Sequence, residues 1–257
     1  MFRSVVFILV VAVTSTSLHA QITADSERLV SYETLYLLVN VKQPPFDNVY
    51  LRYALAMATD RHAITRLLQP GERNYTATKG FVPPYAGYAP LERVVVTVDG
   101  EQIDVLSYDP AMARKMLLKG LVKGQSKNGL RIEVLAYDDD ETVILTNALT
   151  EMWAKNLGAQ VVVTLKRWHD YLASVDRLDF DGVALQGRST LMAQPDALLF
   201  SAMFNLEKLG WTDREIMATL DHIGSERSYF KAAAKLAVAE ERLLKSMPII
   251  PLFSRTP

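Results

Sequence analysis

The chain has 257 residues, contains no cysteine and carries a formal net charge of −1 at pH 7. The lack of cysteine excludes disulfides, thiol nucleophiles and thiolate metal sites. The balanced charge gives no general attraction to nucleic acid or anionic lipid, so we predict no nucleic-acid partner. Because 49% of the residues are hydrophobic and only 22% are charged, the chain can build a core of one or two domains.

The first 20 residues predict export. Arg3 precedes an apolar run over Val5–Val13, and Ala20 ends the stretch. This run is shorter than the about 20 residues that a membrane-spanning helix needs, and the pattern is typical of a cleavable signal peptide. We therefore predict a signal peptide over 1–20 and a mature protein over 21–257, in the periplasm or outside the cell. The alternatives are an uncleaved anchor or a buried strand.

A strand and two helices are predicted next. Thr34–Val41 is rich in branched and aromatic residues, and Pro44-Pro45 ends this strand. Apolar residues then recur at helical spacing, and Asp60 is the expected N-cap of a second helix. Gly and Pro are so frequent over 71–90 that a long ordered loop is predicted there. The positions expected to face inward are Leu51, Ala54, Leu55 and Ala58 in the first helix, and Ile64, Leu67 and Leu68 in the second.

Helices and strands alternate through the middle of the chain. Asp109-Pro110 begins a helix that Gly120 ends. Gly158 ends a second helix, predicted from Thr142 and with Ile144, Ala148, Leu149 and Met152 on its apolar stripe. Strands are predicted over 130–137, 160–165 and near 180–187, with a short helix over 168–174. This order favours an α/β layer packing.

The remaining chain is predicted to be mostly helical. Thr212 and Glu215 have the spacing of a capping box at the start of one helix. Tyr229–Lys245 is a long Ala-rich amphipathic helix that ends at Met247-Pro248. Ile249–Phe253 is predicted to be a short apolar strand.

Motifs for catalysis are scarce, so we predict no enzymatic activity, no cofactor and no metal. The acidic run 138–141 could bind Ca²⁺ or Mg²⁺, but its place before a helix favours helix capping. His62, His169 and His222 are isolated, and no nucleophile elbow, dinucleotide or phosphate loop is present. A triad assembled from distant residues stays open. The aromatic candidates for a ligand pocket are Trp153, Trp168 and Trp211, of which Trp153 is expected in the core.

Asn40–Ile64 reads "NVKQPPFDNVYLRYALAMATDRHAI". It resembles the "PPF.D..vR.Al..AiDR.ai" segment of the extracellular solute-binding proteins of family 5, the peptide- and nickel-type binding proteins of bacterial ABC importers. The stretches "YDPAMARKMLLKG", "TNALTEMWAKNLGAQVVVTLKRWHDYLASV" and "AVAEERLLKSMPIIPLF" also resemble that family. The resemblance extends from about Leu35 to Phe253.

The resemblance implies an α/β fold similar to one lobe of a type II periplasmic binding protein, a mixed sheet flanked by helices with a helical C-terminal part. It implies a non-enzymatic substrate-binding component of an ABC importer for peptides or similar solutes, working with a permease in the inner membrane. Arg52 would anchor its helix through an ion pair or a carbonyl group. These roles belong to the scaffold, so they predict fold better than ligand.

Family members carry a first lobe before the PPF segment, and here it is expected to be missing. Thr34–Val41 and Ile249–Phe253 would then lack strand partners. A separate chain could supply the missing lobe. Alternatively, the protein is a remnant or a repurposed structural protein without a transport ligand, or, less favoured, an exported hydrolase.

A second departure concerns the ligand. Many peptide-binding members carry "GW.aDY.dP", whose Asp pairs with the amino terminus of the peptide; this sequence has "QGRSTLMAQPDALL". Pro195 matches, whereas Arg188 takes the Trp position and Leu191 the Asp position. The resemblance thus implies Gln186, Arg188 and Asp196 as substrate-binding candidates. Arg188 would favour an anionic ligand, or else is a surface charge.

Overall fold

The computed structural model describes residues 32–69, 73–84, 88–121, 129–190 and 195–256. The predicted signal peptide and Leu191 lie outside these described residues. The strands are β1 (Tyr32–Val39), β2 (Asn74–Ala77), β3 (Val95–Val98), β4 (Glu101–Asp104), β5 (Arg131–Tyr137), β6 (Gln160–Lys166), β7 (Val183–Thr190) and β8 (Ile249–Thr256). The helices are α2 (Val49–Met57), α3 (Arg61–Leu68), α4 (Pro110–Gly120), α5 (Asp140–Leu157), α6 (Trp168–Asp176), α7 (Pro195–Lys208), α8 (Arg214–Ile223) and α9 (Tyr229–Ser246).

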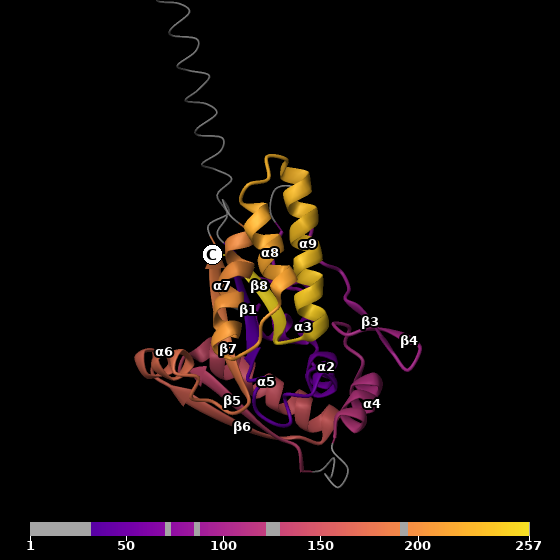
Figure 1. Cartoon of the computed structure of the whole chain (residues 1–257). Coiled ribbons are helices and arrows are strands. Elements are labelled where there is room, and N and C mark those ends of the chain that lie inside the picture. Colours follow the sequence, from indigo (N-terminus) through magenta and orange to yellow (C-terminus); the bar gives the residue numbers. More distant parts are fainter. Residues whose placement is uncertain (1–31, 70–72, 85–87, 122–128, 191–194, 257) are drawn as a thin grey trace, which may run out of the picture.

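Six strands form one mixed sheet in the order β2-β8-β1-β7-β5-β6. Strand β5 runs parallel to β6 and β7, whereas β1 is antiparallel to β7 and β8. In the view of Figure 1, helices α7, α8 and α9 stand in front of β1 and β8. A mixed sheet flanked by helices, with a helical C-terminal part, confirms the predicted fold class.

The prediction that the first and last strands would lack partners is wrong. Strand β1 pairs with β7 on one side and β8 on the other, and β8 also pairs with β2. Both strands are therefore interior strands of the sheet. The backbone N–H and C=O groups of β1 and β8 therefore have hydrogen-bonding partners within this chain. The second partner of β8 is β2, which forms within the segment predicted to be a loop.

The sequence pattern missed β2 and the hairpin of β3 and β4. Strand β2 has only four residues and is partly exposed, so it carries no run of apolar residues. The hairpin turns at Asp99 and Gly100, whose φ angles of 52° and 84° fit a two-residue turn with both φ values positive. The Asp-Gly pair between short branched strands was the available signal for this hairpin.

The two crossover helices cover opposite faces of the sheet. Helix α5 connects β5 to its neighbour β6 at the edge of the sheet, and α6 connects β6 to β7 in the opposite direction across the sheet. Because crossover connections are right-handed, connections that run in opposite directions place their helices on opposite faces of the sheet. On the α5 face, Leu149 and Trp153 join the main core. On the α6 face, Tyr171 packs with Leu135 and Ala184.

Arg52 anchors α2 through backbone carbonyl groups, which confirms one of its two predicted roles. Its Nε and Nη2 donate to the carbonyl oxygen of Ser246, at 3.1 and 2.9 Å. Its Nη1 donates to the carbonyl oxygens of Phe46 and Asp47, at 2.6 and 3.0 Å. Burial lowers the pKa of Arg52 to about 10, so the side chain still carries its charge at neutral pH.

Most predicted helix termini are confirmed. The carboxylates of Asp60, Asp109 and Asp139 accept hydrogen bonds from backbone N–H groups in the first turns of α3, α4 and α5. Gly158 ends α5 with a φ of 68°, a conformation that glycine adopts without steric cost. Two residues predicted to face inward do not: Leu67 is 53% exposed and Ile144 is 42% exposed. Each of these two side chains lies just outside the row of residues through which its helix packs against the core.

The predicted N-cap of α8 is wrong by one residue. Thr212 is exposed, and the cap is Asp213, whose carboxylate accepts from the N–H groups of Glu215 and Ile216 at 3.0 and 3.3 Å. Asp213 also binds Arg242 of α9 at 2.6 Å. A carboxylate satisfies both the helix terminus and the neighbouring cation, which a hydroxyl group cannot do.

This arrangement gives a prediction about stability. Asp213→Ala should lower the free energy of unfolding by about 1 to 2 kcal/mol, because a cap and an ion pair are lost together. Thr212→Ala should change it by less than about 0.5 kcal/mol. Urea denaturation followed by circular dichroism measures both. Equal effects of the two substitutions would contradict the assignment of Asp213 as the cap.

Candidate functional site

A cavity of about 380 Å³ lies beside the carboxyl ends of β5 and β7, and we call it the β7 cavity. Gln186 and Arg188 of β7 line it, together with Trp168 and Tyr171 of α6 and Asn205 of α7. The strand order changes direction at β5, because β6 and β7 lie on its two sides. In open α/β sheets, ligands bind beyond the carboxyl ends of strands at such a switch point.

The register of β1 and β7 gathers polar groups on one face. Thr34 lies opposite Arg188, and Tyr36 lies opposite Gln186. Directly opposed residues of antiparallel strands point to the same side of the sheet, and so do residues two positions apart. These four side chains therefore share one face of the sheet. Ala184 lies on the same face and packs with Tyr171 of α6.

Aromatic rings form a wall of the cavity. Trp168 stacks on Tyr171, with ring centroids 5.7 Å apart, and Tyr137 meets Trp168 edge to face at 5.2 Å. Trp168 remains 58% exposed, although a tryptophan is usually well buried. Tyr171 donates to the carbonyl oxygen of Leu185, and the Gln186 amide donates to the Tyr171 hydroxyl. Burial raises the pKa of Tyr171 above its usual value.

The acidic side chains of the cavity already have cationic partners. Glu33 accepts from Arg255 at 2.7 Å, and Lys208 binds Asp176 at 2.6 Å. The hydrogen bond to Lys208 lowers the pKa of Asp176. Arg188, in contrast, forms no ion pair in the described part of the chain. Among the described residues that line the cavity, Arg188 is therefore a cation without an acidic partner.

Two of the three predicted substrate-binding residues lie at the β7 cavity. Gln186 and Arg188 both line the β7 cavity, and Gln186 is already bound to Tyr171. Asp196 lies in the first turn of α7, and its side chain is outside the described part of the structure. Sequence reasoning missed Asn205, which no motif marks.

The three tryptophans have different roles. Trp153 is fully buried, as predicted, and its Nε1 donates to Thr59 Oγ1 at 3.0 Å. Trp211 is partly buried against the main core. Among these three, only Trp168 lines the β7 cavity.

The acidic run 138–141 has capping and ion-pairing roles. Asp139 accepts from the N–H of Thr142 at 2.6 Å and caps α5, as predicted. Glu141 binds Arg255 and accepts from the Tyr75 hydroxyl at 2.9 Å. Its oxygens are therefore occupied by protein donors.

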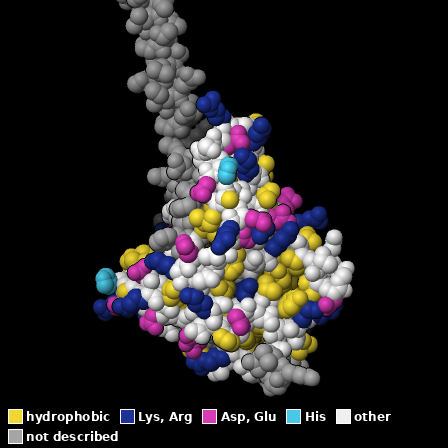
Figure 2. Space-filling view, viewed as in Figure 1, with side chains coloured by type: hydrophobic (Ala, Val, Ile, Leu, Met, Phe, Trp, Pro, Cys, Tyr) yellow, Lys and Arg dark blue, Asp and Glu magenta, His cyan; other side chains and the backbone are white. Residues whose placement is uncertain are grey.

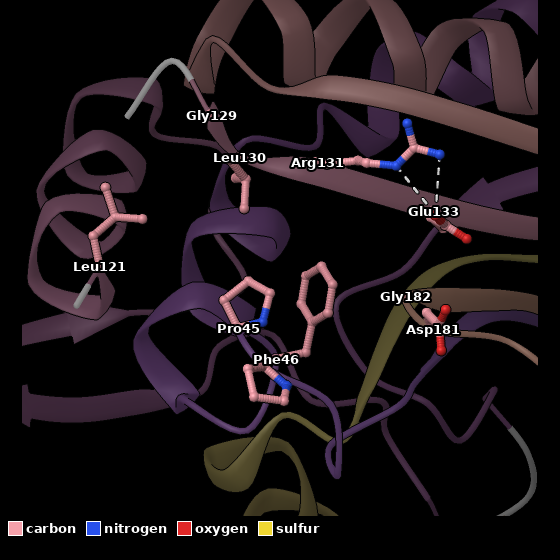
Figure 3. Close-up of a pocket in the computed structure, with 10 residues that line it drawn as sticks. Pro45, Phe46, Leu121, Gly129, Leu130, Arg131, Glu133, Asp181 and Gly182 are labelled. Carbon is pink, nitrogen blue, oxygen red and sulfur yellow. Dashed lines mark hydrogen bonds and ion pairs between the residues drawn. The ribbon is translucent and has the colours of Figure 1, made fainter. Parts of the chain in front are cut away.

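A second cavity, of about 330 Å³, lies at the opposite end of β5 and β7, beside the PPF turn. Figure 3 shows Pro45 and Phe46 at its centre, Leu121 and Leu130 to one side, and Arg131 and Glu133 paired with each other. That ion pair has an N–O distance of 3.1 Å. This cavity lies at the amino ends of the parallel strands, where a switch-point ligand is not expected.

The rest of the described surface offers few sites for chemistry. No cluster of three His, Asp or Glu side chains able to hold a metal occurs in residues 32–69, 73–84, 88–121, 129–190 and 195–256. Figure 2 shows positive and negative side chains interspersed over the visible face. Among the described helices, none is long and apolar enough to cross a bilayer.

The family model described as "Bacterial extracellular solute-binding proteins, family 5 Middle" matches residues 9–208. The oligopeptide-binding protein OppA of Bacillus subtilis (strain 168) is 28% identical over 225 residues, which are 84% of this chain. The chain spans only 39% of that relative's length.

Solved structures share the fold. The murein tripeptide binding protein MppA of Escherichia coli superimposes with a TM-score of 0.72 at 22% identity, over 89% of this chain and 45% of that one. A peptide-binding protein of a peptide ABC transporter gives a TM-score of 0.67 at 21% identity, over 87% of this chain and 99% of that one.

Proposed function

The chain belongs to the bacterial extracellular solute-binding proteins of family 5, and from this membership we propose that it binds a small solute for an ABC importer outside the cytoplasm. Its relatives carry the names of oligopeptide-, dipeptide- and murein peptide-binding proteins, not of enzymes. A peptide or a similar small molecule is accordingly the proposed ligand, and no catalytic step is proposed.

The observation that supports this role is the β7 cavity. An exposed aromatic wall stands beside a cationic side chain that has no acidic partner in the part of the chain that the structure describes, at the switch point of an α/β sheet. Apolar walls with a few convergent polar groups are typical of small-molecule sites. Trp168 would cover an apolar part of the solute, and Gln186 and Arg188 of β7 would orient it.

We propose a signal peptide over 1–20, a solute-binding lobe over 21–257 and a periplasmic or secreted location. Two relatives from Escherichia coli are named as periplasmic proteins, which supports this location. The proposed partners are an inner-membrane permease and the other lobe of the family fold, supplied by a separate chain or by a longer form of this one. The solute would lie between the two lobes.

Calorimetric titration of the purified protein with di- and tri-alanine tests the proposal. We expect saturable binding that Trp168→Ala weakens by about 10-fold, because an aromatic contact is lost. Leu118→Ala is the matched control, since Leu118 is 61% exposed and lies outside the cavity; it should bind like the wild type. The absence of binding to any peptide would instead support a remnant without a transport ligand.

A further inference from the structure

Polar atoms without hydrogen-bond partners concentrate beside the β7 cavity, which Arg188 and Asn205 line. In the described residues, five buried side-chain atoms lack a partner: Thr34 Oγ1, Tyr36 Oη, Arg61 Nη2, Arg188 Nε and Asn205 Nδ2. Four of these five belong to β1, β7 or α7, the elements around this cavity. Buried polar groups in native proteins are nearly always paired, so such a concentration needs an explanation.

These groups are close neighbours. Thr34 lies directly across the ladder from Arg188, with Tyr36 two residues further along the same face. The Tyr36 ring is fully buried, and burial raises its pKa, whereas the nearby Arg188 and Asn205 side chains lower it. Arg188 and Asn205 therefore interact with the Tyr36 hydroxyl, whereas the Arg188 Nε and the Asn205 amide nitrogen have no acceptor in the described residues.

The chemistry of the unpaired atoms is that of donors. The Arg188 Nε and the Asn205 amide nitrogen can only donate, and the Tyr36 hydroxyl can donate as well. Among the described residues that line the cavity, the carboxylates are those of Glu33 and Asp176, and each is held by a cation. The missing partner is therefore an acceptor that also balances the charge of Arg188.

We infer that the β7 cavity binds a carboxylate group of its solute through Arg188 and Asn205, with an adjacent apolar part of the solute on Trp168. A carboxylate accepts several hydrogen bonds at once, and its bonds to a guanidinium are among the strongest that proteins form. This inference rests on the proposed solute-binding function and names the chemical class of the solute.

Titration with tri-alanine and with tri-alanine amide tests the inference, because the two differ only in the carboxylate. The free acid should bind the wild type about 10- to 100-fold more tightly than the amide. Arg188→Gln should remove this preference, and Arg188→Lys should restore part of it. Arg177→Gln removes the same charge from an exposed position at the end of α6 and should leave the preference unchanged. Circular dichroism confirms that each variant is folded.

The outcomes distinguish the carboxylate assignment from the proposed solute-binding function. Equal binding of acid and amide by the wild type, or a preference that survives in Arg188→Gln, would overturn the carboxylate assignment but leave solute binding intact. Inorganic sulfate that bound as tightly as tri-alanine would also overturn it, in favour of a general anion site. If neither peptide bound, the proposed function itself would fail.

Discussion

Between pH 5 and pH 8, the wild-type protein is expected to lose about 2 to 3 kcal/mol of unfolding free energy relative to the variant Glu240→Gln. The reason is the position of Glu240 on α9, where its side chain is completely buried. One carboxylate oxygen accepts from the N–H groups of Phe81 and Val82, and the other accepts from the Tyr88 hydroxyl. Burial raises the pKa of Glu240 to about 7, from a usual value of 4.5.

The sign follows from the order of the two pKa values. The folded protein holds the Glu240 proton more tightly than the unfolded chain, so the proton stabilises the fold below the unfolded pKa of 4.5. This contribution is lost as the pH rises through about 7. A glutamine does not titrate, but it keeps the shape of the side chain and an oxygen that can accept the two N–H groups.

Urea denaturation of the wild type and the variant at pH 5 and pH 8 measures this difference. Glu241→Gln is the matched control, because Glu241 is the next residue of α9 but is 41% exposed and pairs with Lys245 at the surface. It should show no such dependence on pH. A constant difference between the wild type and Glu240→Gln would show that Glu240 has the same pKa in the folded and unfolded chains.

Arg61→Ala is expected to lower the free energy of unfolding by about 3 to 5 kcal/mol. Arg61 begins α3 and is 5% exposed. Its Nε donates to the carbonyl oxygen of Pro251 in β8 at 2.7 Å, and its Nη1 donates to those of Ala56 and Leu106 at 3.2 and 3.1 Å. The guanidinium thus joins three segments that are distant in the sequence.

The substitution leaves buried carbonyl oxygens without donors and also leaves a cavity, and both effects destabilise. Arg66→Ala is the control, because Arg66 lies on the exposed side of the same helix; it should cost less than about 0.5 kcal/mol. Both variants can be compared by urea denaturation at pH 7, where Arg61 is charged because burial lowers its pKa only to about 10. Similar losses in the two variants would contradict the anchoring role of Arg61.

The sequence resemblance predicted part of the candidate site. The resemblance placed Gln186 and Arg188 at a ligand-contacting segment, and both line the β7 cavity. Tyr36 was not among the candidates, because an aromatic residue in a hydrophobic strand is expected to be core. Only the pairing of β1 with β7 brings Tyr36 opposite Gln186, and only the packing of α7 brings Asn205 to them.

The sequence by itself determined the fold class and most helix boundaries. A cap such as Asp60 or Asp139 bonds to an N–H three residues away, so a local pattern contains the whole interaction. The tertiary structure decided the strand partners of β8, the choice of Asp213 over Thr212, and the meeting of Arg188 and Asn205 at the β7 cavity. These three features depend on contacts between segments that are far apart in the chain. A local stretch of sequence does not show which distant segment it will contact, so it does not predict the free energy of that contact.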